Sequence, residues 1–239
     1  MANWAAVLAA DGSLISALGV GFVLGLRHAL DADHVAAVST FVGQNRNVYR
    51  SCVIGTLWGI GHTAALLAAA LVTSVLRLRI PPDVGRTLEG VVAVVVVALG
   101  ANVLLRSLGG LRLHRHEHAH DGASHRHLHL HLGAETAHRH VHLIRGARRP
   151  VLMGALHGLA GSAALLLLVL ATMPSTLAAL LYVAVFGIGS TLGMLIVSGL
   201  IGIPFAVSGS ARLRLGLQLA VGVGSIGVGV AMLRALAAA

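Results

Sequence analysis

Long apolar stretches separated by short polar segments dominate the chain. Five of these stretches reach the roughly 20 residues that a helix needs to cross a bilayer core about 30 Å thick, namely 51–76, 86–105, 150–173, 176–203 and 215–236. The sixth candidate, 14–42, consists of two apolar runs, each too short to span, joined by the polar sequence RHALDADH. Either neither run crosses, or both join into one tilted or broken span. We favour the single span, with the polar sequence near its middle, because the stretch contains no proline.

Two sequence patterns recur at nearly equal offsets. LWGIGHTAALL, from residue 57, resembles VFGIGSTLGML, from residue 185, at an offset of 128. GLRHAL, which contains His28, resembles GALHGL, which contains His157, at an offset of 129. Three spans per half would place the halves in opposite orientations, as in many secondary transporters. The sequence therefore predicts an all-α, polytopic membrane protein with six transmembrane helices in a three-plus-three inverted repeat. The alternative is that glycine-rich membrane helices resemble one another through packing alone.

A polar, histidine-rich segment, 109–149, separates the predicted halves 1–108 and 150–239. It holds eleven of the fifteen histidines, between 114 and 142, and its composition predicts no regular structure without metal. Imidazoles with a pKa near 6.5 are mostly neutral at cytoplasmic pH and can bind divalent ions weakly. We interpret the segment as a metal buffer or collecting arm. A plain linker and a pH-responsive arm are the alternatives.

Composition and charge placement support the membrane assignment. Hydrophobic residues make up 56% of the chain and charged residues only 10%. The formal net charge of +9 could suggest a nucleic-acid partner, but the arginines lie almost wholly in loops and at span ends, and aromatic residues are scarce at 3%. Twelve arginines fall on the side that holds 109–149 and four on the other. The positive-inside rule then places the histidine-rich loop in the cytoplasm and both termini outside.

A small set of ionisable residues lies at membrane depth: His28, Asp31, Asp33, His34, His62 and His157. Such a residue costs about 2.5 to 3.5 kcal/mol at the centre of a span and usually marks a functional site. On a straight helix His28, Asp31 and His34 share one face. Asp33 would point away, to pair with Arg27 or to join the site if the helix unwinds.

Imidazole combined with carboxylate suits nickel, cobalt, zinc or ferrous iron, whereas copper(I) prefers sulfur and magnesium or calcium prefer oxygen. His62 adds a nitrogen from the next span, and His157 is the counterpart of His28 in the second half. For each of these two residues the alternative is a buried neutral ring bonded to a backbone carbonyl. The second half reads HGLAGSA where the first reads HALDADH. We therefore expect the first half to hold the ion.

These residues resemble a known family. RHALDADHVAAVS, with H-x4-D-H at His28, Asp33 and His34, and GIGHTAAL around His62 are similar to signature motifs of the nickel/cobalt transporter family. HGLAGSAAL and FGIGSTLGM resemble its six-span, urease-associated branch. The resemblance implies a permease of the bacterial inner membrane and not an enzyme. It also implies a role in metal recognition for His28, Asp33, His34 and His62.

The resulting hypothesis is uptake of Ni²⁺ or Co²⁺ as a transported ion, without a prosthetic group. Its partners are the ion and the lipid bilayer, with no nucleic acid, and it is compatible with a cytoplasmic metallochaperone and with self-association. Typical members of the best-known branch have eight spans and acidic motifs in later spans, which are missing here. Export on the same scaffold, an intramembrane metalloenzyme and an accessory membrane subunit stay open as alternatives.

Overall fold

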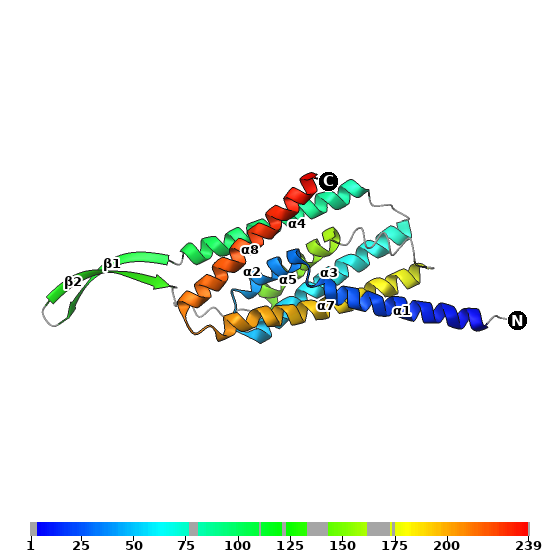
Figure 1. Cartoon of the computed structure of the whole chain (residues 1–239), viewed down its shortest axis with the longest axis horizontal. Coiled ribbons are helices and arrows are strands. Elements are labelled where there is room, and N and C mark those ends of the chain that lie inside the picture. The colour runs from blue at the N-terminus through cyan, green and yellow to red at the C-terminus, as the bar shows by residue number, and fades with distance from the viewer. Residues whose placement is uncertain are drawn as a thin grey trace.

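The computed structural model describes residues 4–76, 81–109, 111–120, 123–132, 143–161, 173 and 175–238. Its helices are α1 (Trp4–His28), α2 (Ala32–Val42), α3 (Val48–Leu76), α4 (Pro82–Gly109), α5 (Leu143–Gly161), α7 (Thr176–Val207) and α8 (Ala211–Ala238). Two strands, β1 (Leu111–His120) and β2 (Ala123–Leu132), follow α4. Figure 1 shows an elongated helical bundle with the strands projecting from one end and both chain termini lying away from them.

The membrane prediction is confirmed at the level of a multi-span helical protein. α3, α4, α7 and α8 are each long and apolar enough to cross a bilayer. Leu14–His28 and Ala32–Val42 pass the same test as a pair, bent by 54° at the break, which makes up to five candidate spans. The expected span 150–173 begins within α5, whereas 162–172 lie outside the described residues.

The break between α1 and α2 has a local cause. The backbone N–H groups of Leu30 and Asp31 donate to the carbonyls three residues back, at 2.9 and 3.1 Å, which tightens the end of α1. Asp31 then adopts an extended conformation, and aspartate is a favoured residue before a helix start. Its carboxylate makes no capping hydrogen bond and instead contacts His28. Of the open alternatives, the structure thus has the broken helix and not the straight one, because His28 ends one helix and His34 lies in the first turn of the next.

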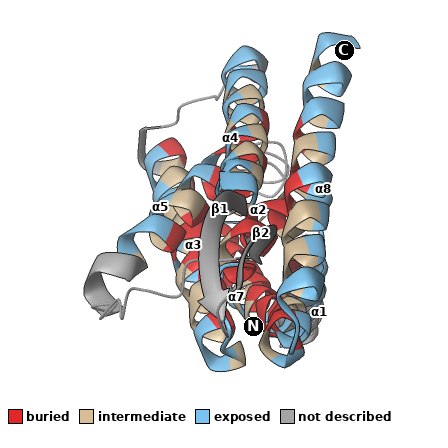
Figure 2. Cartoon of the chain, turned by 90° about the vertical axis from the view of Figure 1, so that its left-hand side faces the viewer, coloured by how far each residue is buried: buried red, intermediate tan, exposed pale blue. Residues whose placement is uncertain are grey.

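The helices pack in two groups with α2 between them. α3 packs against α5 and α7, α1 packs against α7, and α4 packs against α8. Glycines let backbones approach closely: a Cβ at Gly25 would collide with the carbonyl oxygen of Phe186, and one at Gly154 with that of Trp58. Figure 2 shows buried residues gathered where α2, α3 and α7 meet, and exposed outer faces on α4 and α8.

The histidine-rich segment contains an antiparallel hairpin. Backbone pairing places His114 opposite His129, His116 opposite His127 and His118 opposite His125. The prediction of irregular structure is therefore wrong for 111–120 and 123–132. Histidine recurs at every second position of both strands, and a period of two is the period of a β-strand.

Candidate metal site

Four helices bring together the histidines that the sequence singled out. His28 is the last residue of α1, His34 lies in the first turn of α2, His62 lies within α3 and His157 within α5. All four are buried, with exposed fractions of 8, 1, 0 and 1% respectively. The ring of His34 lies 4.5 Å from His28, 5.3 Å from His62 and 5.2 Å from His157, measured between centroids. His34 is thus the hub of the cluster.

Three of these rings could close on one ion. One nitrogen from each of His28, His34 and His62 lies within 4.8 Å of the other two. Three nitrogen ligands of one first-row ion lie about 3.0 to 3.6 Å apart at angles of about 90° to 120°, since each metal–nitrogen bond is about 2.1 Å long. Small inward movements of the side chains would therefore bring the three nitrogens to ligand distance.

Each aspartate of RHALDADH orients a different histidine. His28 Nδ1 lies 2.7 Å from Asp31 Oδ2, and His34 Nδ1 lies 3.1 Å from Asp33 Oδ1. A neutral ring that donates from Nδ1 keeps its lone pair at Nε2, where it can bind a metal. Carboxylates bonded to the far nitrogen commonly hold metal-binding histidines in this way. The break in the helix gives Asp33 a partner in the site, which a straight helix would have denied it.

His157 and His62 offer further nitrogens. His157 Nδ1 donates to the carbonyl oxygen of Met153 at 3.1 Å, which matches the alternative of a ring bonded to backbone but leaves Nε2 available. The Nε2 atoms of His28, His34 and His157, and both ring nitrogens of His62, are buried without a hydrogen-bond partner among the described residues. Buried polar atoms are normally paired, so this cluster has unused capacity for a ligand.

Two aromatic residues that the sequence analysis missed border the site. The ring of Phe186 lies 5.4 Å from His28, and the ring of Trp58 lies 5.0 Å from His157. They occupy matching positions in LWGIGH and VFGIGS, 128 residues apart, so aligning the repeat position by position would have found both. Their apolar surfaces limit the water around the imidazoles.

A second set of ligand atoms overlaps the first. Oxygens of Asp31 and Asp33 and a nitrogen of His34 also lie within 4.8 Å of one another. The side chain of Asp31 is 54% exposed and that of Asp33 is 19% exposed. The site therefore offers carboxylate at its accessible edge and imidazole in its buried interior.

Buried imidazoles beside carboxylates, inside a bundle of apolar helices, are typical of membrane proteins that handle transition-metal ions. Comparison with known proteins gives the particular family. The chain belongs to the NicO family, described as high-affinity nickel-transport protein, which it matches over residues 14–238. It is accordingly a nickel-transport protein of the membrane and not an enzyme.

Two relatives illustrate the family. The urease accessory protein UreH of Bacillus sp. (strain TB-90) is 40% identical over 195 residues, which cover 82% of this chain and 80% of the relative. The hydrogenase nickel incorporation protein HupN of Bradyrhizobium diazoefficiens is 31% identical over 110 residues, 44% of this chain and 23% of that protein. No solved structure matches the chain.

Proposed function

We propose that this protein is a permease that carries Ni²⁺, with Co²⁺ as a second substrate, through a site formed by His28, His34 and His62. The observation that carries the proposal is the convergence of three buried imidazoles from α1, α2 and α3, with nitrogens within 4.8 Å of one another. A divalent ion would supply the missing partner for all three nitrogens at once, and would replace the water it loses with these ligands.

The surrounding residues have distinct proposed roles. Asp31 and Asp33 orient the two histidines of the broken span, balance the charge of the ion and offer it oxygen at the accessible edge. His157 is a fourth nitrogen ligand, which reaches the ion from beside His34. Ligands rich in imidazole favour the later first-row ions over magnesium and calcium. The name of one relative, the hydrogenase nickel incorporation protein HupN, agrees with nickel.

We further propose six spans arranged as a three-plus-three inverted repeat, with halves 1–108 and 150–239. Two close helix contacts support this arrangement: Gly25 lies against the carbonyl of Phe186, and Gly154 lies against that of Trp58. Gly154 is the repeat equivalent of Gly25, and Phe186 is that of Trp58, at offsets of 129 and 128 residues, so the two contacts are equivalent. Thr63 Oγ1 and Thr191 Oγ1, 128 residues apart, lie 3.2 Å from each other, as equivalent residues would beside a two-fold axis. Rocking of one repeat, or of one helix bundle, against the rest around a central site is a common transport mechanism.

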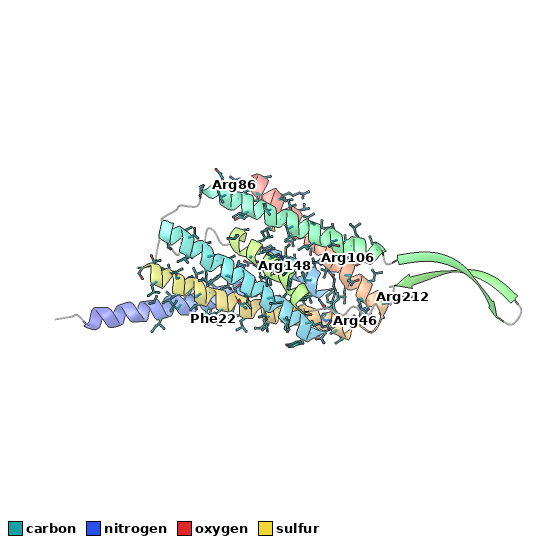
Figure 3. All side chains as sticks on the ribbon, turned by 180° about the vertical axis from the view of Figure 1, so that it is seen from behind. Phe22, Arg46, Arg86, Arg106, Arg148 and Arg212 are labelled. Atoms are coloured by element: carbon teal, nitrogen blue, oxygen red, sulfur yellow. The ribbon has the colours of Figure 1, made fainter. Side chains whose placement is uncertain are left out.

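The direction we propose is uptake, with segment 109–149 in the cytoplasm of a bacterium and both termini outside. Arg46, Arg106 and Arg212 lie toward the hairpin end of the bundle, and Arg86 lies toward the other (Figure 3), in keeping with the positive-inside rule. A membrane potential of 100 mV would drive two charges inward by about 4.6 kcal/mol. The hairpin, with its paired histidine positions, would receive the ion and pass it to a cytoplasmic acceptor such as a metallochaperone.

Transport of radioactive nickel into proteoliposomes tests the function and the site together. We expect uptake driven by an inside-negative potential, inhibited by excess cobalt more than by excess zinc, and abolished in His28→Ala. Thr73→Val is the matched control, because Thr73 bonds only carbonyls of its own helix, three turns from His62. Normal uptake by His28→Ala would refute the site. Movement of nickel only out of preloaded vesicles, with the cytoplasmic side inward, would reverse the proposed direction.

A further inference from the structure

Helix α8 holds α2 by two hydrogen bonds to its backbone. Ser225 Oγ donates to the carbonyl oxygen of Ala36 at 3.0 Å in a buried position, and Gln218 Nε2 donates to that of Gly43 at 3.2 Å. The donors are seven residues apart and so are the acceptors, in opposite order. Seven residues make about two helical turns, or roughly 10 Å. α2 and α8 therefore run antiparallel, and one side of α8 is hydrogen-bonded to one side of α2.

These bonds join two helices, as does the bond from Thr63 Oγ1 to the carbonyl oxygen of Gly187, whereas most other hydroxyl bonds among the described residues stay within one helix. Ser39 and Thr73, for example, donate to carbonyls of their own helices. The carbonyl of Gly43 lies beyond the last residue of α2, where no helical N–H follows to pair with it. Gln218 satisfies this group from another helix, which matters where water is scarce.

The same side chain ties α2 to α4. Gln218 Oε1 accepts a hydrogen bond from Ser107 Oγ of α4 at 3.3 Å. α4 and α8 are themselves in close backbone contact, since a Cβ at Gly100 would lie 2.7 Å from the carbonyl oxygen of Gly222, and one at Gly229 would lie 2.7 Å from that of Ala93. α4 and α8 thus form a closely packed pair that holds α2.

The histidine cluster is divided between α2, which the α4–α8 pair holds, and three other helices. His28, His62 and His157 belong to α1, α3 and α5, which pack with α7 or with one another. Within the part of the chain that the structure describes, His34 is the member of the cluster that lies on α2. Movement of the α4–α8 pair would therefore change the distances from His34 to His28 and His62.

Space for such a movement exists at the far end of α2. A cavity of about 90 Å³ lies between α2, α4 and α8 and is lined by polar residues that include Ser39, Gln44, Arg106 and Gln218. A water molecule occupies about 30 Å³ of liquid, so roughly three could fit. The C-terminal end of α2 is therefore less closely packed on this side than a filled interface would be.

We propose that Gln218 and Ser225 are positioning residues of the transport cycle, which couple α2, and through it His34 and Asp33, to the movement of the α4–α8 pair. The inference rests on the proposed metal site. Loss of the two bonds leaves the ligands in place, so nickel still binds. It uncouples α2 from the pair, so the bound ion is passed on more slowly.

The test compares binding with transport in the full-length protein. Ser225→Ala, Gln218→Leu and the double variant are assayed for nickel affinity by equilibrium dialysis in detergent and for the maximal rate of nickel uptake in liposomes. We expect affinity within about two-fold of the original protein and a rate lowered about five-fold in the double variant, within the range found for coupling residues. Thr73→Val serves as the control for loss of a buried hydroxyl and should change neither.

Two results overturn the coupling. One is an unchanged rate in all three variants, and the other is a rate and an affinity that fall together, which would mean that the residues merely support the site. If the double variant does not fold, the affinity and the uptake rate of Gln218→Leu alone test the coupling, because this residue lies at the margin of the cavity. His34→Ala separates the two hypotheses: full nickel binding by this variant would refute the metal site, whereas the rate of Gln218→Leu judges the coupling.

Discussion

Neutralising each aspartate of the broken span in turn should lower nickel affinity by different amounts. Asp33 is 19% exposed and bonds His34, which is almost completely buried, whereas Asp31 is 54% exposed and bonds His28. Asparagine keeps an oxygen that can accept from Nδ1 but removes the negative charge. The comparison therefore isolates the charge of each carboxylate from its size.

The structure sets the expected order of the two effects. Loss of a carboxylate that orients a metal-binding histidine costs about 10- to 100-fold in metal affinity, or about 1.4 to 2.8 kcal/mol. Asp31 is the more exposed of the two carboxylates, so we expect its charge to be better screened and Asp31→Asn to lie near or below the ten-fold end. Asp33→Asn acts where screening is weaker and should lie near the hundred-fold end.

Equilibrium dialysis of the purified protein with radioactive nickel measures both dissociation constants. Asp83→Asn provides a control, because Asp83 is an exposed acid in the first turn of α4. An equal or larger loss in Asp31→Asn would refute the reasoning. It would mean that the shorter hydrogen bond, 2.7 Å against 3.1 Å, matters more than burial.

Four further predictions address the rest of the site and fold. His157→Ala should weaken nickel binding about ten-fold or more if the ring is a fourth ligand, which dialysis measures; unchanged binding would leave His157 a packing residue. Gly154→Ala should lower the melting temperature, because its Cβ meets backbone, whereas Gly19→Ala, where nothing lies within 4 Å, should not. Thr63→Val should cost about 0.6 kcal/mol of stability by loss of interhelical hydrogen bonds, measured by denaturant unfolding, with the nickel affinity unchanged. Deleting 111–132 should leave uptake by proteoliposomes intact but slow nickel accumulation in cells at low external nickel; loss of liposome uptake would assign the hairpin to the pathway itself.

The sequence predicted the membrane class and the histidine cluster because both depend on strong local signals. Apolar stretches of spanning length have few other uses, and imidazoles at membrane depth must converge on something that compensates their burial. The positions of His28, His34, His62 and His157 in one cluster agree with that reasoning. The repeat pattern also indicated which helices contribute.

The roles of the aspartates were harder to predict, because they depend on one backbone turn. A break within RHALDADH was one of the alternatives, but the segment contains neither glycine nor proline, so the sequence did not indicate that α1 would end at His28. The bonds of Gln218 and Ser225 to α2 were equally out of reach, since polar residues in spans can bond their own helix as easily as another. The hairpin was not predicted, because the polar composition of 111–132 favours irregular structure, although the histidines alternate there with the period of a strand.

The gradient of exposure across the helix break determines the order in which an approaching ion meets its ligands. Asp31 is 54% exposed, Asp33 19%, His34 1% and His62 0%. At the proposed site a cation would meet oxygen first and nitrogen last, and it would exchange its hydration shell in steps. Magnesium and calcium favour oxygen ligands, so they would gain little from moving on to the buried imidazoles. The carboxylates would thus select for charge and the imidazoles for ligand chemistry at different depths. Magnesium or calcium could then dissociate from the carboxylates before it loses its last water ligands.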